Sequence, residues 1–527
     1  MPRFRPVLHF VLLTAFASPA LPAADLTLRP ERTDWRETSA NADVIAHLEQ
    51  AAALHPRMHL TAFGASEQGR PLPLLVVGPD SAAAATAAAV RASDRLRIYL
   101  KGNIHAGEVA GKEALLRLVR NLAQGEHPEW TRDWVLLIGP NYNPDGNDNL
   151  DLRHRLLQHG PVAGMGTREN AQGLDLNRDL MKLDAPESRA FVRLLNEWDP
   201  HVVVDLHTTN GTRHAYHLTY APGLHPATPA PLDRFLRNEL LPAATTDYAR
   251  RWGWHLEHYG NVMERHGRRG WWTFDARPRY LTNYVGVRGR LAILSEAYSY
   301  LTFEDRVRAT ERFLNALLEN LYIRRGEVFS LVESTAGSAL PGRKLPLRGE
   351  LPADPPVREI LLGAVAEDTH PLTGETILRR LDVANPERMP VADAFAAADA
   401  VEMPEAYLLS ADATALVAHL RLHGISVEPL PPDWRGEAQA FLIDSVQTAE
   451  RPFQGRHEQK ITGRWAEARP TDGPAGGYRV SLRQPLARLA VLLLEPTADD
   501  GLANWGFLSP WLDPNRSLPI WREPVRE

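Results

Sequence analysis

The chain has 527 residues, 44% of them hydrophobic, and a formal net charge of -6 at pH 7. This length allows two or three domains with a large core, and the mild acidity argues against nucleic acid or an anionic membrane as a partner. Because the sequence contains no cysteine, disulfides, a thiol nucleophile and thiolate metal ligands are all excluded. Any bound metal must be held by histidine, aspartate and glutamate.

The first two dozen residues differ in composition from the rest of the chain. Arg3 and Arg5 precede an apolar run over residues 7–17, and small residues and prolines follow it. This order is typical of a cleaved secretory signal peptide, and the apolar run is too short to remain as a membrane span. We therefore expect residues 1–24 to be removed and the protein to be exported, periplasmic or secreted, without a membrane anchor.

From residue 42 onward, apolar strands alternate with helices of roughly 10–15 residues. The pattern predicts helices over residues 42–54, 109–123, 186–197 and 304–324, and strands over 59–63, 73–77, 96–100, 134–138, 201–206 and 291–294. The first two strands flank a turn-rich segment and are expected to form a hairpin. This alternation is typical of an α/β fold with a mixed central sheet flanked by helices.

The C-terminal third differs from the rest of the chain in composition and in the order of its predicted helices and strands. A stretch rich in Ser, Gly and Pro over residues 334–356 indicates a linker. Beyond it we expect strands over 406–409, 425–430, 478–482 and 488–494 and a helix over 413–423, which indicate a smaller β-rich α+β domain. The expected organisation is a catalytic domain over 25–330, a linker over 331–356 and an accessory domain of unknown role over 357–527.

A candidate metal site follows the strand over residues 96–100. His105 and Glu108 lie three residues apart in a Gly-rich turn, so an imidazole and a carboxylate can face one ion. His207 follows a second apolar strand, and the carboxyl ends of parallel strands meet at one edge of a sheet. Together the three side chains provide three protein ligands and leave a fourth position open, as a catalytic zinc site requires.

Three further residues are candidates for catalysis or substrate binding beside such an ion. Glu296 ends another apolar strand, where its carboxylate can take a proton from water and pass it to a leaving group. Arg178 offers a forked, permanently charged donor that suits a carboxylate, and Arg168 can stand over a developing oxyanion. The structural alternative is a glutamate at a helix N-terminus or in an ion pair, and two solvated arginines in a polar loop.

These features, in this order, resemble the zinc carboxypeptidase family, the carboxypeptidase A/B-like metallopeptidases, over about residues 42–324. The motifs that carry the resemblance are the turn Gly64–Arg70, His105 with Glu108, Asn143-Pro-Asp-Gly146, the segment Gly173–Arg178, His207 and Glu296. Several motifs in one order are far more specific than any one of them.

The resemblance implies a role for each matching residue of the metal site. One Zn²⁺ per chain would be bound by His105, Glu108 and His207. Glu296 would act first as the general base and then as the general acid. Asp175 would accept the other ring N–H of His105 and so set its tautomer.

The resemblance also implies how a substrate is held. Asn177 and Arg178 would bind the free C-terminal carboxylate of a peptide, and Arg168 would stabilise the oxyanion. Arg153 and Arg155 compete with Arg168 for that role, because the loop that contains them is rearranged relative to pancreatic-type enzymes.

The tyrosine that the family places over the bound substrate has no single match. We assign Tyr284 to substrate binding, with Tyr280 as the alternative, while the pancreatic-type spacing falls near Phe274. The identity of the side-chain pocket is left open by the sequence.

The sequence therefore predicts an exported zinc metallopeptidase that hydrolyses C-terminal peptide bonds, with a peptide bearing a free C-terminal carboxylate as its partner. The main alternative is an amide hydrolase of the same fold that acts on acyl-amino acids or murein peptides. A noncatalytic zinc-binding relative is a third reading, opposed by the presence of the complete set His105, Glu108, His207 and Glu296. The oligomeric state is not indicated.

Overall fold

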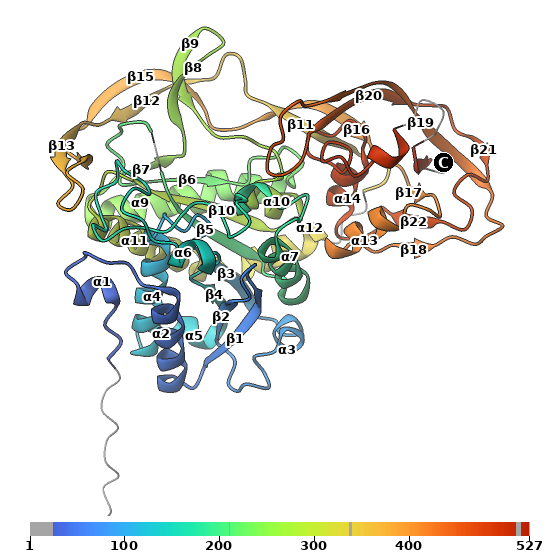
Figure 1. The fold of residues 1–527 in the computed structure, drawn as a ribbon. Helices are drawn as coiled ribbons and strands as arrows, with labels where there is room; N and C mark the ends of the chain where they lie inside the picture. Colours follow the sequence, from blue (N-terminus) through green and yellow to red (C-terminus); the bar gives the residue numbers. More distant parts are fainter. Residues whose placement is uncertain (1–24, 210, 337–339, 513–517, 526–527) are drawn as a thin grey trace, which may run out of the picture.

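The computed structural model describes residues 25–209, 211–336, 340–512 and 518–525. Figure 1 shows a larger α/β region built around a central sheet and, beside it, a β-rich region formed by the C-terminal part of the chain. The predicted signal peptide lies outside the described residues. Within the described part, no helix is both long and apolar enough to cross a membrane.

The central sheet has eight strands in the order β1-β2-β4-β3-β5-β10-β6-β7. These are β1 (Met58–Ala65), β2 (Pro71–Val77), β3 (Leu96–Gly102), β4 (Trp134–Gly139), β5 (Val202–Thr208), β6 (Leu218–Pro222), β7 (Leu256–His258) and β10 (Leu291–Ala297). β1 and β2 form an antiparallel hairpin, whereas β4, β3, β5 and β10 run parallel to one another. The mixed central sheet and the first hairpin are thus confirmed.

Alternation along the strands divides the core into two layers. Val203 and Tyr99 belong to one buried cluster, and their chain neighbours Val204 and Leu100 belong to the other. Because successive strand residues point to opposite faces, continuous apolar strands bury both faces of a sheet. This explains why β3 and β5 carry runs of consecutive apolar residues, such as Ile98–Leu100 and Val202–Val204, rather than strictly alternating apolar and polar ones.

Helices cover both faces of the sheet. On one face lie α2 (Asn41–Leu54), α4 (Ala110–Ala123), α9 (Leu241–Trp252) and α11 (Phe303–Ile323), and on the other lie α7 (Pro186–Trp198) and α10 (Leu281–Val287). The start of α11 is set by Thr302, whose hydroxyl accepts from the backbone N–H of Asp305. The helices predicted in this region are present, with ends that differ by one or two residues.

The C-terminal part of the chain is rich in strands, as predicted. The strands β17 (Ala406–Leu409), β18 (Glu428–Pro429), β19 (Gly436–Thr448), β20 (Gln459–Trp465), β21 (Arg469–Thr471), β22 (Tyr478–Ser481) and β23 (Ile520–Glu523) make one sheet, against which α13 (Thr414–Leu422) and α14 (Ala487–Leu494) pack. This region shares a buried cluster with α7 and α10 of the larger region.

Strands also pair across the expected domain boundary. A four-stranded sheet has the order β12-β15-β9-β8, where β8 (Asn261–Arg265) and β9 (Arg268–Trp272) come from the larger region and β12 (Val357–Leu362) and β15 (Asn385–Ala392) follow it in the chain. Figure 1 shows these strands as an arch above the central sheet. The C-terminal part is therefore attached to the larger region by pairing and by packing.

One local prediction is wrong. The run over residues 488–494, expected to be a strand, is the helix α14, in which every residue except Arg488 is buried. Its leucines and alanines favour a helix, and an apolar run of this length has no periodicity that separates the two forms. The stretch 331–356, predicted to be a linker, contains the end of α12 (Arg325–Ala336) and the strand β11 (Lys344–Glu350), which pairs with β16 (Ala396–Glu402).

Candidate active site

The candidate metal ligands meet at the carboxyl edge of the central sheet. His105 lies in the turn between β3 and α4, Glu108 lies just before α4, and His207 lies near the end of β5. Glu296 on β10 is the register partner of His207. Parallel pairing of β3, β5 and β10 therefore brings four side chains together from segments that are almost two hundred residues apart.

The three ligand side chains are buried, and one donor atom from each lies within 4.8 Å of the others. Nδ1 of His105 is 3.0 Å from Oε1 of Glu108, and Nδ1 of His207 is 2.8 Å from Oε2 of the same carboxylate. Two imidazoles and a carboxylate that converge in this way form a donor set that suits Zn²⁺. The residues present thus fit the metal that the sequence predicts.

Each histidine is oriented by a second carboxylate. Nε2 of His105 donates to Oδ1 of Asp175 at 3.0 Å, and Nε2 of His207 donates to Oδ2 of Asp205 at 2.9 Å. These contacts turn Nδ1 of both rings toward Glu108, as metal-binding histidines usually require. Asp205 was missed by the sequence reasoning, although its position two residues before His207 on one strand places both side chains on the same face.

Replacing Asp175 with asparagine is expected to weaken zinc binding by about 10- to 100-fold, because the carboxylate that orients His105 is lost. The dissociation constant can be measured by competition with a chromophoric chelator. Glu169→Gln is the matched control, since this carboxylate lies in the same loop but accepts from the hydroxyl of Thr167. Equal affinities for the Asp175 variant and the unmodified protein would contradict this role.

Glu296 faces the same cavity as the metal ligands. Burial raises the pKa of its carboxyl to about 8; the nearby His207 opposes this rise and Glu108 adds to it. A bound divalent cation would lower this pKa, because it favours the charged form of the carboxyl. The position is therefore one where a carboxyl can both accept and release a proton near neutral pH.

A cavity of about 250 Å³ connects these groups. It brings together seven of the nine residues predicted for the site, namely His105, Glu108, Arg168, Asn177, Arg178, His207 and Glu296. Asp175 lies directly behind His105, as described above. Of the nine predicted residues, Tyr284 is the one that lies away from the site.

The residues predicted to bind a substrate carboxylate lie in the short helix η1 (Leu176–Arg178). Oδ1 of Asn177 accepts from the backbone N–H of Leu281 at 2.8 Å, which leaves the amide NH₂ of Asn177 as a donor. The guanidinium of Arg178 lies 4.0 Å from the centroid of the Tyr280 ring. The two side chains thus present donors to the cavity from neighbouring positions of one short helix.

Two arginines flank the metal site. Arg168 donates through Nε and Nη2 to Oδ2 of Asp175, at 2.9 and 2.7 Å. Arg155 donates through Nη2 to Oε1 of Glu108 at 2.6 Å and also lines the cavity. Arg153 is exposed and does not line it. Arg168 remains the predicted oxyanion donor, with Arg155 as its competitor.

The assignment of Tyr284 to substrate binding needs correction. Its side chain is fully buried, and its hydroxyl lies 2.7 Å from Nδ1 of His423 in the C-terminal region. Tyr280 precedes the first residue of α10 at the cavity, whereas Tyr284 lies one turn further along the helix and faces away from it. Tyr280 and Phe274 both line the cavity, so the alternative that the sequence left open is the better candidate.

Two histidines and a glutamate converge beside a buried carboxyl, an arrangement that suits a zinc hydrolase. Residues 44–183 match the zinc carboxypeptidase family. Carboxypeptidase 2 of Trichophyton equinum is 24% identical to this chain over 487 residues, which is 87% of this chain and 81% of that protein. Carboxypeptidase D of Mus musculus is 35% identical over 147 residues, which is 25% of this chain and 10% of that protein.

Among solved structures, a metallo-carboxypeptidase from Burkholderia cenocepacia has a TM-score of 0.41 and 18% sequence identity, and the match covers 54% of this chain and 70% of that one. The sequence matches confirm the resemblance found in the motifs. The match to the zinc carboxypeptidase family covers residues 44–183, the part of the chain that carries most of these motifs.

Proposed function

We propose that this chain is a metallocarboxypeptidase that binds one Zn²⁺ and releases residues from the C-terminus of peptides. The observation that carries the proposal is a single cavity that holds His105, Glu108 and His207, with Glu296 and Arg178 facing the same space. When bound, Zn²⁺ would polarise the scissile carbonyl and lower the pKa of the attacking water. The relatives named carboxypeptidase agree with this activity.

The other steps belong to the side chains of the chain itself. Glu296 takes the proton of the attacking water and delivers it to the leaving amine. Arg168, or its neighbour Arg155, donates hydrogen bonds to the oxygen on which negative charge develops. Asn177 and Arg178 hold the terminal carboxylate, so that the last peptide bond lies at the metal site.

Two other readings are less favoured. An amide hydrolase that acts on acyl-amino acids or murein peptides would share the metal ligands, but the relatives are named carboxypeptidases. A noncatalytic relative would not need Glu296 buried against the metal site. We also propose that the protein is exported, periplasmic or secreted, on the composition of residues 1–24.

Removal of the metal provides the test of this function. We expect one zinc per chain by mass spectrometry of the metal content, loss of peptide hydrolysis in the presence of a chelator, and recovery with one equivalent of Zn²⁺. His207→Ala is expected to purify without zinc and without activity. His457→Ala, at an exposed histidine of the C-terminal region, is the control and is expected to keep both. Full activity in metal-free protein would refute the proposal.

A further inference from the structure

Beside its charged groups, the cavity has an apolar part, which is lined by Leu294, Phe274 and the ring of Tyr259. Leu294 lies two residues before Glu296 on β10, so both side chains point to the same face of the sheet. Leu294 is 5% exposed and lines the cavity together with Tyr259 and Phe274. Behind it, the buried cluster continues with Ala221, Leu224 and Ala276.

The charged groups at the cavity all serve the metal or the peptide backbone. Among the described residues that line it, the carboxylates are those of Glu108 and Glu296, which lie at the metal site. Asp275 is the next acidic residue along the wall, but its carboxylate accepts from Nε of Arg277 and lines a different cavity. A lysine or arginine side chain that entered the apolar part would therefore lose its hydration without gaining a partner.

We propose that this cavity selects C-terminal residues with neutral, apolar side chains and rejects lysine and arginine. The inference rests on the proposed function, because it assumes that Arg178 holds the terminal carboxylate. With the carboxylate there and the scissile bond at the metal, the side chain of the last residue is left facing Leu294, Phe274 and Thr282. The ligand class is thus a peptide that ends in an aliphatic or aromatic residue.

The test uses N-acylated dipeptides that differ only in their last residue: Phe, Leu, Lys or Arg. We expect kcat/KM for Phe and Leu to exceed that for Lys and Arg by at least about 100-fold. Equal rates, or a preference for Lys and Arg, would overturn the specificity while leaving the carboxypeptidase function intact. Hydrolysis of none of the four by zinc-loaded protein would overturn the proposed function itself and the specificity with it.

A variant can weaken the preference. Thr282 is 3% exposed, lines the cavity and lies in the first turn of α10, where a carboxylate is compatible with the helix. Thr282→Asp is expected to lower the ratio of Phe to Lys hydrolysis by at least about tenfold, because it supplies a buried partner for the cation. Thr282→Val, which has the same shape without the charge, is expected to keep the ratio. An unchanged ratio in folded Thr282→Asp would contradict the placement of the side chain.

A second, independent observation concerns the C-terminal region. The loop 449–458 between β19 and β20 lies against the segment that carries the carboxylate-binding pair, Asn177 and Arg178. Oε1 of Gln454 accepts from the backbone N–H of Asp175 at 2.7 Å, and Arg456 forms an ion pair with Asp184 at 2.6 Å. The first of these contacts lies two residues from Asn177.

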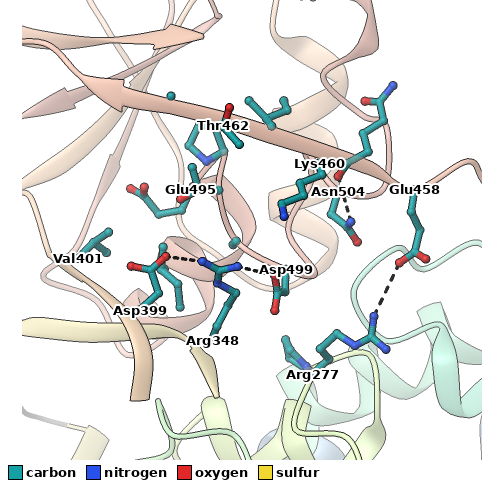
Figure 2. Close-up of a pocket in the computed structure, with 18 of the residues that line it drawn as sticks. Arg277, Arg348, Asp399, Val401, Glu458, Lys460, Thr462, Glu495, Asp499 and Asn504 are labelled. Atoms are coloured by element: carbon teal, nitrogen blue, oxygen red, sulfur yellow. Dashed lines mark hydrogen bonds and ion pairs between the residues drawn. The ribbon is translucent and has the colours of Figure 1, made fainter. Parts of the chain in front are cut away.

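The same region also holds the residue next to Tyr280. Arg279 is 1% exposed at its side chain, and it donates through Nε to Asp500 at 2.8 Å and through Nη2 to Glu458 at 2.6 Å. Figure 2 shows the neighbouring Arg277 reaching the same Glu458 across the cavity between the two regions. The C-terminal region therefore contacts two segments next to Arg178. One contains Asp175, and the other contains Arg279 and ends in Tyr280, whose ring lies against Arg178.

We infer that the β19–β20 loop positions the carboxylate-binding pair, with Gln454 as a positioning residue. The inference rests on the proposed function. The side chain of Asp175 accepts from the backbone N–H of Asn177, so a shift of Asp175 would move the start of η1. Without the Gln454 acceptor, the N–H of Asp175 loses its partner, and the donors of Asn177 and Arg178 move relative to the metal site.

The experiment compares three variants on a peptide with a free C-terminus. Gln454→Met keeps the length of the side chain but removes the acceptor, and it is expected to lower kcat/KM about tenfold, chiefly through KM. Gln454→Glu retains an acceptor and is expected to restore most of this loss. Gln447→Met, on the same hairpin and outside the contact, is the matched control.

Zinc content and melting temperature are measured for the same proteins. We expect both to match the unmodified protein in all three variants, because Gln454 is only half-buried. An unchanged KM in Gln454→Met, an equal loss in Gln447→Met, or a loss that follows a lower melting temperature would overturn the positioning role. A change in zinc content alone would point to the metal site and would also contradict it. Absence of hydrolysis in the unmodified protein would instead refute the proposed function.

Discussion

Glu296→Gln is expected to retain zinc and to lower kcat by about 10³-fold, within the range that a positioned acid or base contributes. Glutamine has almost the same shape but cannot accept the proton of the attacking water. Because Glu296 lies opposite His207 without being one of the three converging ligands, the metal site should remain intact. The measurements are kcat on a peptide with a free C-terminus and zinc content per chain.

The control for this change is Glu257→Gln. Glu257 lies on β7 of the same sheet and has a pKa raised by burial, but it does not line the cavity. It is expected to keep normal turnover. If Glu296→Gln retained more than about a tenth of the activity, the role of general base would have to be assigned to another group.

Arg178→Met is expected to lower kcat/KM for peptides with a free C-terminus by about 10²- to 10³-fold. Loss of one partner of a buried, hydrogen-bonded charge pair costs about 2–5 kcal/mol, which corresponds to changes of this size. Methionine keeps an apolar contact with the ring of Tyr280 while removing the charge. The ratio of rates on free and amidated forms of one peptide isolates this effect from general damage.

Arg153→Met provides the comparison, because Arg153 is exposed in the loop after α6 (Pro144–Asp148) and lies outside the cavity. Its ratio of rates is expected to equal that of the unmodified protein. A normal ratio in Arg178→Met would show that the terminal carboxylate is bound elsewhere. In that case the alternative amide hydrolase would become the better reading.

Much of the catalytic region could be predicted, because the apolar runs in the sequence correspond to strands that pair in parallel in the structure. The runs that become β3, β5 and β10 are apolar and end in polar, chemically active residues, so their order along the chain already indicates one sheet edge. Parallel pairing then places His105, Glu108, His207 and Glu296 together. Asp175 and Arg178 are only three residues apart, and in the structure Asp175 directly precedes the short helical turn η1, which Arg178 ends.

The parts that were missed depend on partners far away in the sequence. The sequence does not distinguish Tyr280 from Tyr284 as the residue that contacts the substrate. The distinction depends on where α10 begins and on the contact between Tyr284 and His423. The continuous apolar sequence of α14 fits a buried strand as well as a buried helix, so periodicity alone does not assign it. Contacts such as Gln454 with Asp175 join residues 279 positions apart, and no local signal predicts them.

The most direct test of carboxypeptidase activity is mass spectrometry of one peptide, in free and amidated forms, after incubation with zinc-loaded protein. We expect the free form to be shortened from its C-terminus, one residue at a time, and the amidated form to stay intact over the same period. Equal consumption of both forms, or fragments from internal or N-terminal cleavage, would contradict this activity.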